Sequence, residues 1–272
     1  MINNDKDAIK IIKNRVEKLD DETIEYSILF TILSLMENYS FIDNQTYPRP
    51  SHPNINKRKD SYFTLIAIIL SLRTTLENEQ NAVKQFMERY NGIDDVLNSN
   101  VDEIAQMIKC AGMPVKKANT IFELSKIIKE QYFGNIKNII EKDIESTRKK
   151  LLLLPGVGEK SADCMLELAF DLPSIVIDIN MFRVVSRLYF DDQNMSFNNN
   201  KDILRIKNFL ENNLISDYQI YQIVHTIFLL HGKYICKSKP LCTKCKLSHI
   251  CKYCSINNYL LFKKITDAMI NN

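Results

Sequence analysis

The segment from Leu151 to Arg183, LLLLPGVGEKSADCMLELAFDLPSIVIDINMFR, constrains the fold of this chain more than any other. Its Pro155-Gly156-Val157-Gly158 motif predicts a tight turn, because proline cannot continue a helical hydrogen-bond ladder and glycine adopts positive φ easily. Apolar residues at helical spacing on both sides predict two helices, one over residues 143–153 and one that begins near Glu159. The sequence therefore predicts a helical hairpin in which the N-terminus of the second helix is placed to bind a phosphate.

Two ionisable residues follow this turn closely. Lys160 falls in the first turn of the second predicted helix, where the positive end of the helix dipole disfavours a protonated amine. Asp178 follows a chain break at Asp171-Leu172-Pro173 and opens the next predicted helix. Taken singly, such a lysine is typical of a solvated surface and such an aspartate of an N-cap. Taken together, they predict an amine and a carboxylate at two helix starts that face one cleft.

The segments LPGVGEKSA and IDINMFRV place Lys160 and Asp178 eighteen positions apart. In these motifs and this separation, the chain resembles the helix-hairpin-helix (HhH-GPD) DNA glycosylases of the endonuclease III type. The resemblance implies a base-excision-repair DNA glycosylase and AP lyase that removes damaged bases, with oxidised pyrimidines as the expected class, from duplex DNA. It implies that Lys160 attacks C1′ of a flipped-out nucleotide, that Asp178 accepts the lysine proton, and that β-elimination then cuts the strand 3′ to the abasic site.

The composition is typical of a helical globular protein. Hydrophobic residues make up 45% of the 272 residues, only six residues are glycine, and apolar residues recur at helical spacing. These features predict an all-α fold, and the length favours two modest domains. The resemblance implies a barrel of about six helices over residues 58–172, which carries the hairpin. It also implies a discontinuous, cluster-bearing domain made of two N-terminal helices with a linker (1–57) and a C-terminal part (173–272), with the active-site cleft between the two domains.

Five cysteines lie close together near the C-terminus, in KYICKSKPLCTKCKLSHICKYC. Four of them have the spacing C-x5-C-x2-C-x5-C. Four thiolates this close suit tetrahedral zinc or an iron-sulfur cluster, and spacing alone does not decide between the two. The pattern resembles the C-terminal [4Fe-4S] loop of endonuclease III-type enzymes, although its first interval is one residue shorter than is usual there. The implied ligands are Cys236, Cys242, Cys245 and Cys251, with Cys254 as a substitute for Cys251.

The resemblance also implies a set of DNA contacts. Arg73 ends a predicted buried helix where the family has a glutamine wedge, and the loop IKCAGMPVKKA offers Met113 as the apolar residue that enters the base stack. An exposed arginine at a helix end is the simpler interpretation of Arg73, and a solvated basic face that of Lys117. Lysines of the cysteine loop can offset thiolate charge, contact phosphate, or do both. The expected contacts are Arg73, Met113, Lys117, Pro155, Gly156, Val157, Gly158, Lys237 and Lys239.

The expected partner follows from the resemblance rather than from charge. The net charge of +3 is too small to indicate nucleic acid by itself. The N-terminus has no apolar signal region, and no apolar run approaches the roughly 18 residues that span a bilayer. We therefore expect a cytoplasmic, nucleoid-associated monomer that binds double-stranded DNA carrying a damaged base or an abasic site, and that binds no membrane.

Two alternative functions remain open. A monofunctional adenine or mismatch thymine/uracil DNA glycosylase would share the fold and the cluster. Lys160 argues against this alternative, because serine or tyrosine is typical at that position, whereas Asn180 favours it, because adenine glycosylases have asparagine where endonuclease III has histidine. A non-catalytic helix-hairpin-helix DNA-binding protein would use the hairpin and the cysteine loop only to grip the backbone, and its Lys160 would be unreactive.

Overall fold

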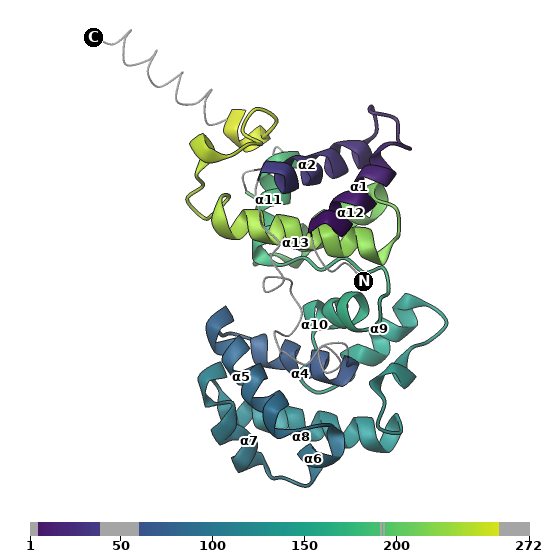
Figure 1. Cartoon of the computed structure of the whole chain (residues 1–272), viewed down its shortest axis with the longest axis vertical. Coiled ribbons are helices and arrows are strands. Elements are labelled where there is room, and N and C mark those ends of the chain that lie inside the picture. The colour runs from purple at the N-terminus through teal and green to yellow at the C-terminus, as the bar shows by residue number, and fades with distance from the viewer. Residues whose placement is uncertain (1–4, 39–59, 191, 193, 256–272) are drawn as a thin grey trace, which may run out of the picture. The chain divides into compact units, whose positions relative to one another are not determined.

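The structure, a computed structural model, describes residues 5–38, 60–190, 192 and 194–255. Every regular element in these ranges is a helix (Figure 1). The predicted all-α class is therefore confirmed. The described residues form two compact units, each around its own apolar core. Unit 1 combines residues 5–38 with the described residues between 175 and 255, and unit 2 contains residues 60–174.

Unit 2 is built around α4 (Ser61–Ser71). This helix is buried from its first residue to Leu70, as expected of a helix that is apolar on all sides. Asp60 caps its N-terminus, where the carboxylate accepts the Tyr62 backbone N–H at 2.8 Å. The other elements of the unit are α5 (Leu76–Arg89), α6 (Ile93–Leu97), α7 (Val101–Met107), the 3-10 turn η1 (Lys109–Ala111), α8 (Pro114–Gln131), the 3-10 turn η2 (Ile136–Ile139), α9 (Ile144–Leu152), α10 (Glu159–Cys164) and η3 (Met165–Ala169).

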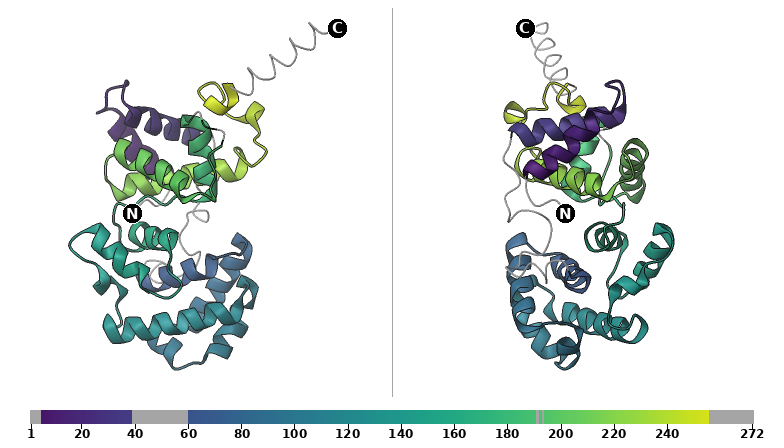
Figure 2. Two further views of the ribbon diagram at one scale, coloured as in Figure 1. Left: turned by 180° about the vertical axis from the view of Figure 1, so that it is seen from behind. Right: turned by 45° about the vertical axis from the view of Figure 1, so that its right-hand side comes forward.

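Unit 1 brings the N-terminal and C-terminal parts of the chain together. In both views of Figure 2, helices α1 (Asp5–Val16) and α2 (Ile24–Asn38), drawn in purple, lie against α13 (Tyr218–Tyr234), drawn in green. Helix α11 (Ile179–Tyr189) packs against both α13 and α12 (Asn200–Asn213). The N-terminal helices thus complete the core of the unit that carries Asp178.

The predicted helical hairpin forms in unit 2. Its first helix, α9, is capped by Asp143, whose carboxylate accepts the Ser146 backbone N–H at 2.8 Å. Its second helix, α10, begins at Glu159 as predicted but continues as the π-helical segment η3. There the Phe170 N–H donates to the carbonyl of Met165, five residues back, at 3.0 Å. The sequence pattern did not predict this widening, because apolar spacing is similar in the two kinds of helix.

No helix among the described residues combines the length and the apolar character that crossing a membrane requires. The predicted linker after the two N-terminal helices, which contains Pro48, Pro50 and Pro53, lies outside the described residues.

Candidate functional site

The turn of the hairpin is shaped by Gly156, which has φ +74°. A Cβ at this position would lie 2.6 Å from the Cγ2 atom of Thr120, so the turn packs directly on α8. Pro155 before it is partly buried, and Val157 after it is 7% exposed and belongs to the core. Gly158 is exposed and is the N-cap of α10. The turn therefore exposes backbone rather than large side chains at the start of α10.

Lys160 is exposed in the first turn of α10. Its charge acts on Glu79, a partly buried residue in the first turn of α5. Burial raises the pKa of Glu79 to about 7, and the positive charges of Lys160 and Lys117 limit that rise. Among the described residues, the Glu79 carboxyl forms no hydrogen bond or ion pair. Glu79 is therefore a carboxyl group that changes protonation near neutral pH within the field of Lys160.

A buried ion pair ties the two hairpin helices together. Arg148 of α9 pairs with Asp163 of α10. Ser174 joins the pair, because its hydroxyl donates to Asp163 at 2.8 Å and accepts from Arg148 at 3.0 Å. None of the three residues is more than 9% exposed. Removing one partner of such a pair leaves a buried charge without compensation, so the network fixes the orientation of the helix that carries Lys160.

Asp178 is the N-cap of α11 in unit 1 and is 7% exposed. One of its carboxylate oxygens accepts the Met181 N–H at 2.8 Å, and the other accepts the side-chain amide of Asn180 at 2.9 Å. Arg183 holds Asn180 in turn, donating to its amide oxygen at 2.8 Å and to the carbonyl of Cys236 at 2.8 Å. Asp178 is thus a helix cap, and hydrogen bonds also connect it to the cysteine loop.

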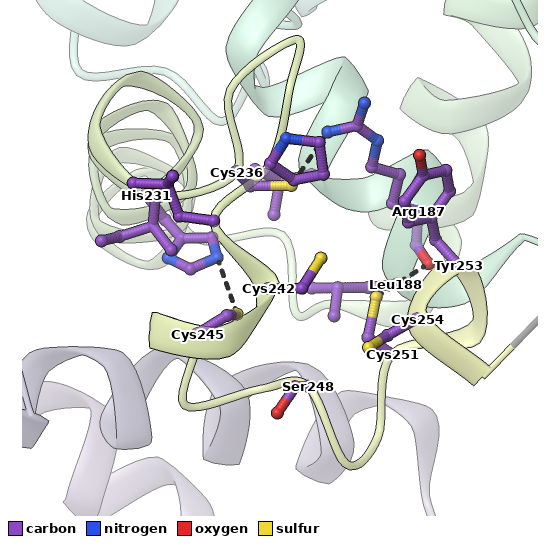
Figure 3. A pocket seen from close by; sticks show the side chains of 14 residues that line it. Arg187, Leu188, His231, Cys236, Cys242, Cys245, Ser248, Cys251, Tyr253 and Cys254 are labelled. Carbon is purple, nitrogen blue, oxygen red and sulfur yellow. Dashed lines mark hydrogen bonds between the residues drawn. The ribbon is translucent and has the colours of Figure 1, made fainter. Parts of the chain in front are cut away.

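Five cysteine side chains line one pocket of unit 1 (Figure 3). Two basic residues reach the thiols: Arg187 Nη1 donates to Cys236 Sγ at 3.4 Å, and His231 Nε2 lies 3.7 Å from Cys245 Sγ. The pocket does not separate Cys251 from Cys254, because both are 9% exposed and both line it. All four predicted ligands and the predicted substitute therefore lie around the same space: Cys236, Cys242, Cys245, Cys251 and Cys254.

The donor set of this pocket fits a metal centre bound by thiolates. Burial raises the pKa of the Cys245 thiol to about 11, and the neighbouring thiols add to this rise. The same causes raise the pKa of Cys242 and Cys251. Thiols in such surroundings ionise when a cation compensates their charge. In the part of the chain that the structure describes, no three His, Cys, Asp or Glu side chains are already arranged to hold a metal ion, so the fit is one of donor chemistry and location.

Lys237 and Lys239 are exposed on the loop between the first two cysteines. Arg187 fixes this loop, since its guanidinium donates to the Lys237 carbonyl at 2.6 Å and to the Ser238 carbonyl at 3.0 Å. The backbone of the loop is thereby held while both lysine side chains face solvent. Their phosphate contacts remain a prediction.

The two predicted wedge residues, Arg73 and Met113, are exposed and share an unusual backbone conformation. Their φ angles are 52° and 49°, in the left-handed region. This region is strained for residues other than glycine, and strained residues are often found at functional sites. The structure thus gives the two residues one common property, and their role as wedges remains a prediction.

Lys117 is not the surface residue that the sequence predicted. It is 3% exposed, and its ammonium donates to the carbonyl oxygens of Leu70 and Ala111, each at 2.8 Å. The reason is helical periodicity, because Lys117 shares the buried face of α8 with Ile121 and Leu124, four and seven residues further on. The predicted phosphate contact of Lys117 is therefore wrong.

The profile of the HhH-GPD superfamily of base excision DNA repair proteins matches residues 66–207 of the chain. This range contains the hairpin, Lys160 and Asp178, and it spans more than half of the sequence. The chain belongs to this superfamily.

Within the superfamily, the most informative relatives are endonucleases III. The enzyme of Rickettsia prowazekii is 30% identical over 220 residues, which cover 80% of this chain and 95% of the relative. The enzyme of Escherichia coli is 28% identical over 204 residues, which cover 74% of this chain and 89% of the relative. The endonuclease III type predicted from the motifs is confirmed, and the chain is a base-excision DNA glycosylase with AP lyase activity.

Solved structures share the fold. A trapped covalent intermediate of endonuclease III with DNA has a TM-score of 0.65 at 24% identity and covers 86% of this chain and 98% of its own. A thermostable thymine-DNA glycosylase has a TM-score of 0.65 at 24% identity and covers 90% and 97%. Because two activities share one fold at this level of identity, the fold does not tell them apart.

Three residues of the site were missed from the sequence: Glu79, Arg148 and Arg183. Glu79 belongs to no recognisable motif, because it comes near Lys160 only when the chain folds. Arg148 looks like one more basic residue of the amphipathic helix α9. Arg183 did offer a signal, because it lies three residues after Asn180 and side chains at that spacing meet on a helix.

Proposed function

We propose that the chain removes oxidised pyrimidines from duplex DNA and then cleaves the strand at the resulting abasic site. The observation that carries this proposal is the position of Lys160. Its amine is exposed in the first turn of the second hairpin helix, where lysine is typical of the bifunctional enzymes that this chain resembles. The Arg148 network supports the proposal, because it holds that helix in one orientation.

In the proposed reaction, Lys160 and Asp178 act on the same flipped-out nucleotide. The lysine lone pair forms a bond to C1′, the glycosidic bond breaks, and the base leaves with the bonding electrons. Asp178 accepts the proton that the amine loses. Opening of the sugar ring gives a protonated Schiff base, which acidifies C2′–H, and loss of that proton expels the 3′ phosphate.

The hydrogen bonds at Asp178 support its proposed role. Both of its carboxylate oxygens are engaged, by Met181 and by Asn180, so its orientation is fixed before DNA binds. A carboxylate that needs no reorganisation stabilises developing positive charge on the sugar more effectively than a mobile one. Asn180 thus has a positioning role, consistent with a lyase as well as with an adenine glycosylase.

The cysteine pocket is the proposed site of a [4Fe-4S] cluster held by Cys236, Cys242, Cys245 and Cys251. When bound, the cluster supplies a structural clip for the loop, because the proposed chemistry needs no redox step. Lys237 and Lys239 on that loop would contact the DNA backbone and add affinity without reading sequence. The chain would act on DNA as a monomer.

Borohydride trapping on a panel of duplexes, each with one lesion, tests this function. Borohydride reduces the Schiff base, so the wild-type protein should become covalently linked to duplexes with an oxidised pyrimidine or an abasic site. Lys160→Gln should abolish both the link and base release. Lys149→Gln, which replaces an exposed lysine on α9, is the matched control and should retain both.

Two outcomes would overturn the proposal. Trapping on mismatched duplexes only would replace the substrate class. A Lys160→Gln protein that still releases bases but no longer cuts abasic DNA would show that water is the nucleophile in base release, as in a monofunctional glycosylase.

A further inference from the structure

Lys117 joins the ends of two helices inside unit 2. Its ammonium donates to the Leu70 carbonyl in the last turn of α4 and to the Ala111 carbonyl at the end of η1, each at 2.8 Å. The last carbonyls of a helix have no partner within the helix and must find one elsewhere. Both carbonyls also lie at the negative end of a helical segment, where a cation is favoured. This explains why a lysine that is 3% exposed is tolerated here.

The same two helix ends lead into the two predicted wedge residues. Arg73 lies two residues after the end of α4, and Met113 lies two residues after the end of η1. Each has left-handed backbone, with φ of 52° and 49°. A non-glycine residue keeps such a conformation only where its surroundings hold it. The Lys117 ammonium is a contact common to both turns, three residues before Arg73 and two before Met113.

We propose that Lys117 is a positioning residue that holds the Arg73 and Met113 turns in fixed positions relative to each other. Both side chains are then already placed to enter the DNA stack together. The wedge role of these turns is the prediction made from the family resemblance and rests on the proposed function, whereas the tie between them does not. When the two wedges are already held in place, binding costs less conformational entropy. This gain applies to kinked or damaged DNA, which the wedges can enter, and not to intact duplex.

Two groups near Lys117 favour its charged form. Burial lowers the pKa of Lys117, and the Glu79 carboxyl and the Cys110 thiol oppose this lowering. Cys110 lies in η1 itself and is hydrogen-bonded to the Asn78 carbonyl of α5 at 3.6 Å. An uncharged replacement of similar length therefore removes the donors and the charge, while an arginine keeps both.

Three single variants test the proposal in the full-length protein. Lys117→Met removes every donor at nearly the same volume, Lys117→Arg restores donors and charge, and Lys126→Met replaces an exposed lysine of the same helix as a control. The first measurement is hydrogen exchange of the backbone amides in DNA-free protein. With Lys117→Met, exchange should rise at least tenfold in both the 72–74 and the 112–113 segments, and Lys117→Arg should return it toward wild type.

The second measurement is affinity for two duplexes, one intact and one with a tetrahydrofuran abasic analogue that cannot form a Schiff base. Lys117→Met should reduce the preference for the analogue about tenfold, because unordered wedges lose their advantage on kinked DNA. In an Arg73→Ala/Met113→Ala background, the same change should have no further effect on the preference. Lys126→Met should leave the preference unchanged.

Each outcome has a distinct meaning. If exchange rises in one turn only, or rises evenly through unit 2, Lys117 is an ordinary core residue and the proposal fails. If Lys117→Met does not fold, Lys117→Arg decides: wild-type exchange in both turns supports the tie, and faster exchange in one turn only opposes it. If the turns loosen together while the preference stays at its wild-type value, the tie stands and the proposed wedge function fails.

Discussion

The side-chain amide of Asn180 donates a hydrogen bond of 2.9 Å to the second carboxylate oxygen of Asp178. Because Arg183 donates to the oxygen of the same amide at 2.8 Å, the NH2 group of Asn180 is oriented toward Asp178. Position 178 therefore has to present two acceptors, one to the Met181 N–H and one to Asn180. An ionised aspartate has two acceptor oxygens and meets this requirement, whereas the other common N-cap side chains have only one oxygen.

Asp178→Asn should separate the capping role of this residue from its catalytic role. Asparagine caps helices as well as aspartate, but its NH2 group would face the NH2 group of Asn180. We expect a loss of about 1 kcal/mol in the free energy of unfolding from this mismatch. We expect a fall of about 100-fold in the single-turnover rate of base release, because the proton acceptor and the negative charge are gone. A rate near wild type in a folded variant would leave Asp178 as a cap only.

Two glycines of the hairpin turn should respond differently to alanine. Gly156→Ala places a Cβ in the left-handed region and 2.6 Å from Thr120 Cγ2, so it should lower the free energy of unfolding by about 1–3 kcal/mol. Gly158 has φ −103° and no atom within 4 Å of a built Cβ, so Gly158→Ala should be neutral or slightly stabilising. Urea denaturation of the two variants checks this. Equal losses would show that the turn is not packed on α8 as described.

Glu79→Gln should change the pH dependence of stability. Burial raises the pKa of Glu79 from 4.5 to about 7 in the folded protein, against the pull of Lys160 and Lys117. Below pH 4.5 the group is protonated in both states, so the substitution has little effect there. Between pH 4.5 and about 7, Glu79 is ionised in the unfolded state but still protonated in the folded state. The stability of the wild type therefore falls as pH rises through this range and levels off above about 7. The variant should lack this fall.

Thermal unfolding of wild type and Glu79→Gln at several pH values from 4 to 9 measures the difference. Glu77→Gln, an exposed residue in the same turn of α5, controls for the loss of a negative charge near a helix N-terminus. A gain in stability for Glu79→Gln that is the same at every pH would show that Glu79 does not keep its proton in the folded protein.

Iron binding should distinguish the role of Cys251 from that of Cys254 in the cysteine pocket. Both thiols line the pocket, but only Cys251 completes the C-x5-C-x2-C-x5-C spacing of the cluster loop. In protein purified without air, wild type should contain about four irons per chain. Cys236→Ser and Cys251→Ser should each lose iron and local protection of the loop, since metal binding and loop folding are coupled. Cys254→Ser should keep its iron, and iron loss from Cys254→Ser but not from Cys251→Ser would exchange the roles of these two cysteines.

Local pattern alone determined a large part of this molecule. Apolar residues at helical spacing and the low glycine content predicted the all-α class, and the Pro-Gly-Val-Gly turn predicted the hairpin. Both signals are local, because helix periodicity and turn chemistry depend on residues within a few positions of one another. The same local motifs singled out Lys160 and Asp178 and predicted the family that the comparison with known proteins confirmed. The five clustered cysteines needed no folding to be recognised, since they lie within nineteen positions of the chain.

Only the tertiary structure decided which side chains beyond these motifs support the site. Lys117 reads as a surface lysine, yet packing turns it toward carbonyls six and forty-seven residues away. Glu79 and Arg183 acquire their roles from Lys160 and Cys236, which are distant in sequence. Such pairings depend on which helix faces bury together, and that outcome sums many weak contacts over the whole core. No stretch of a few residues encodes that sum. The sequence motifs therefore identified the reactive residues, but not the residues that hold them in position.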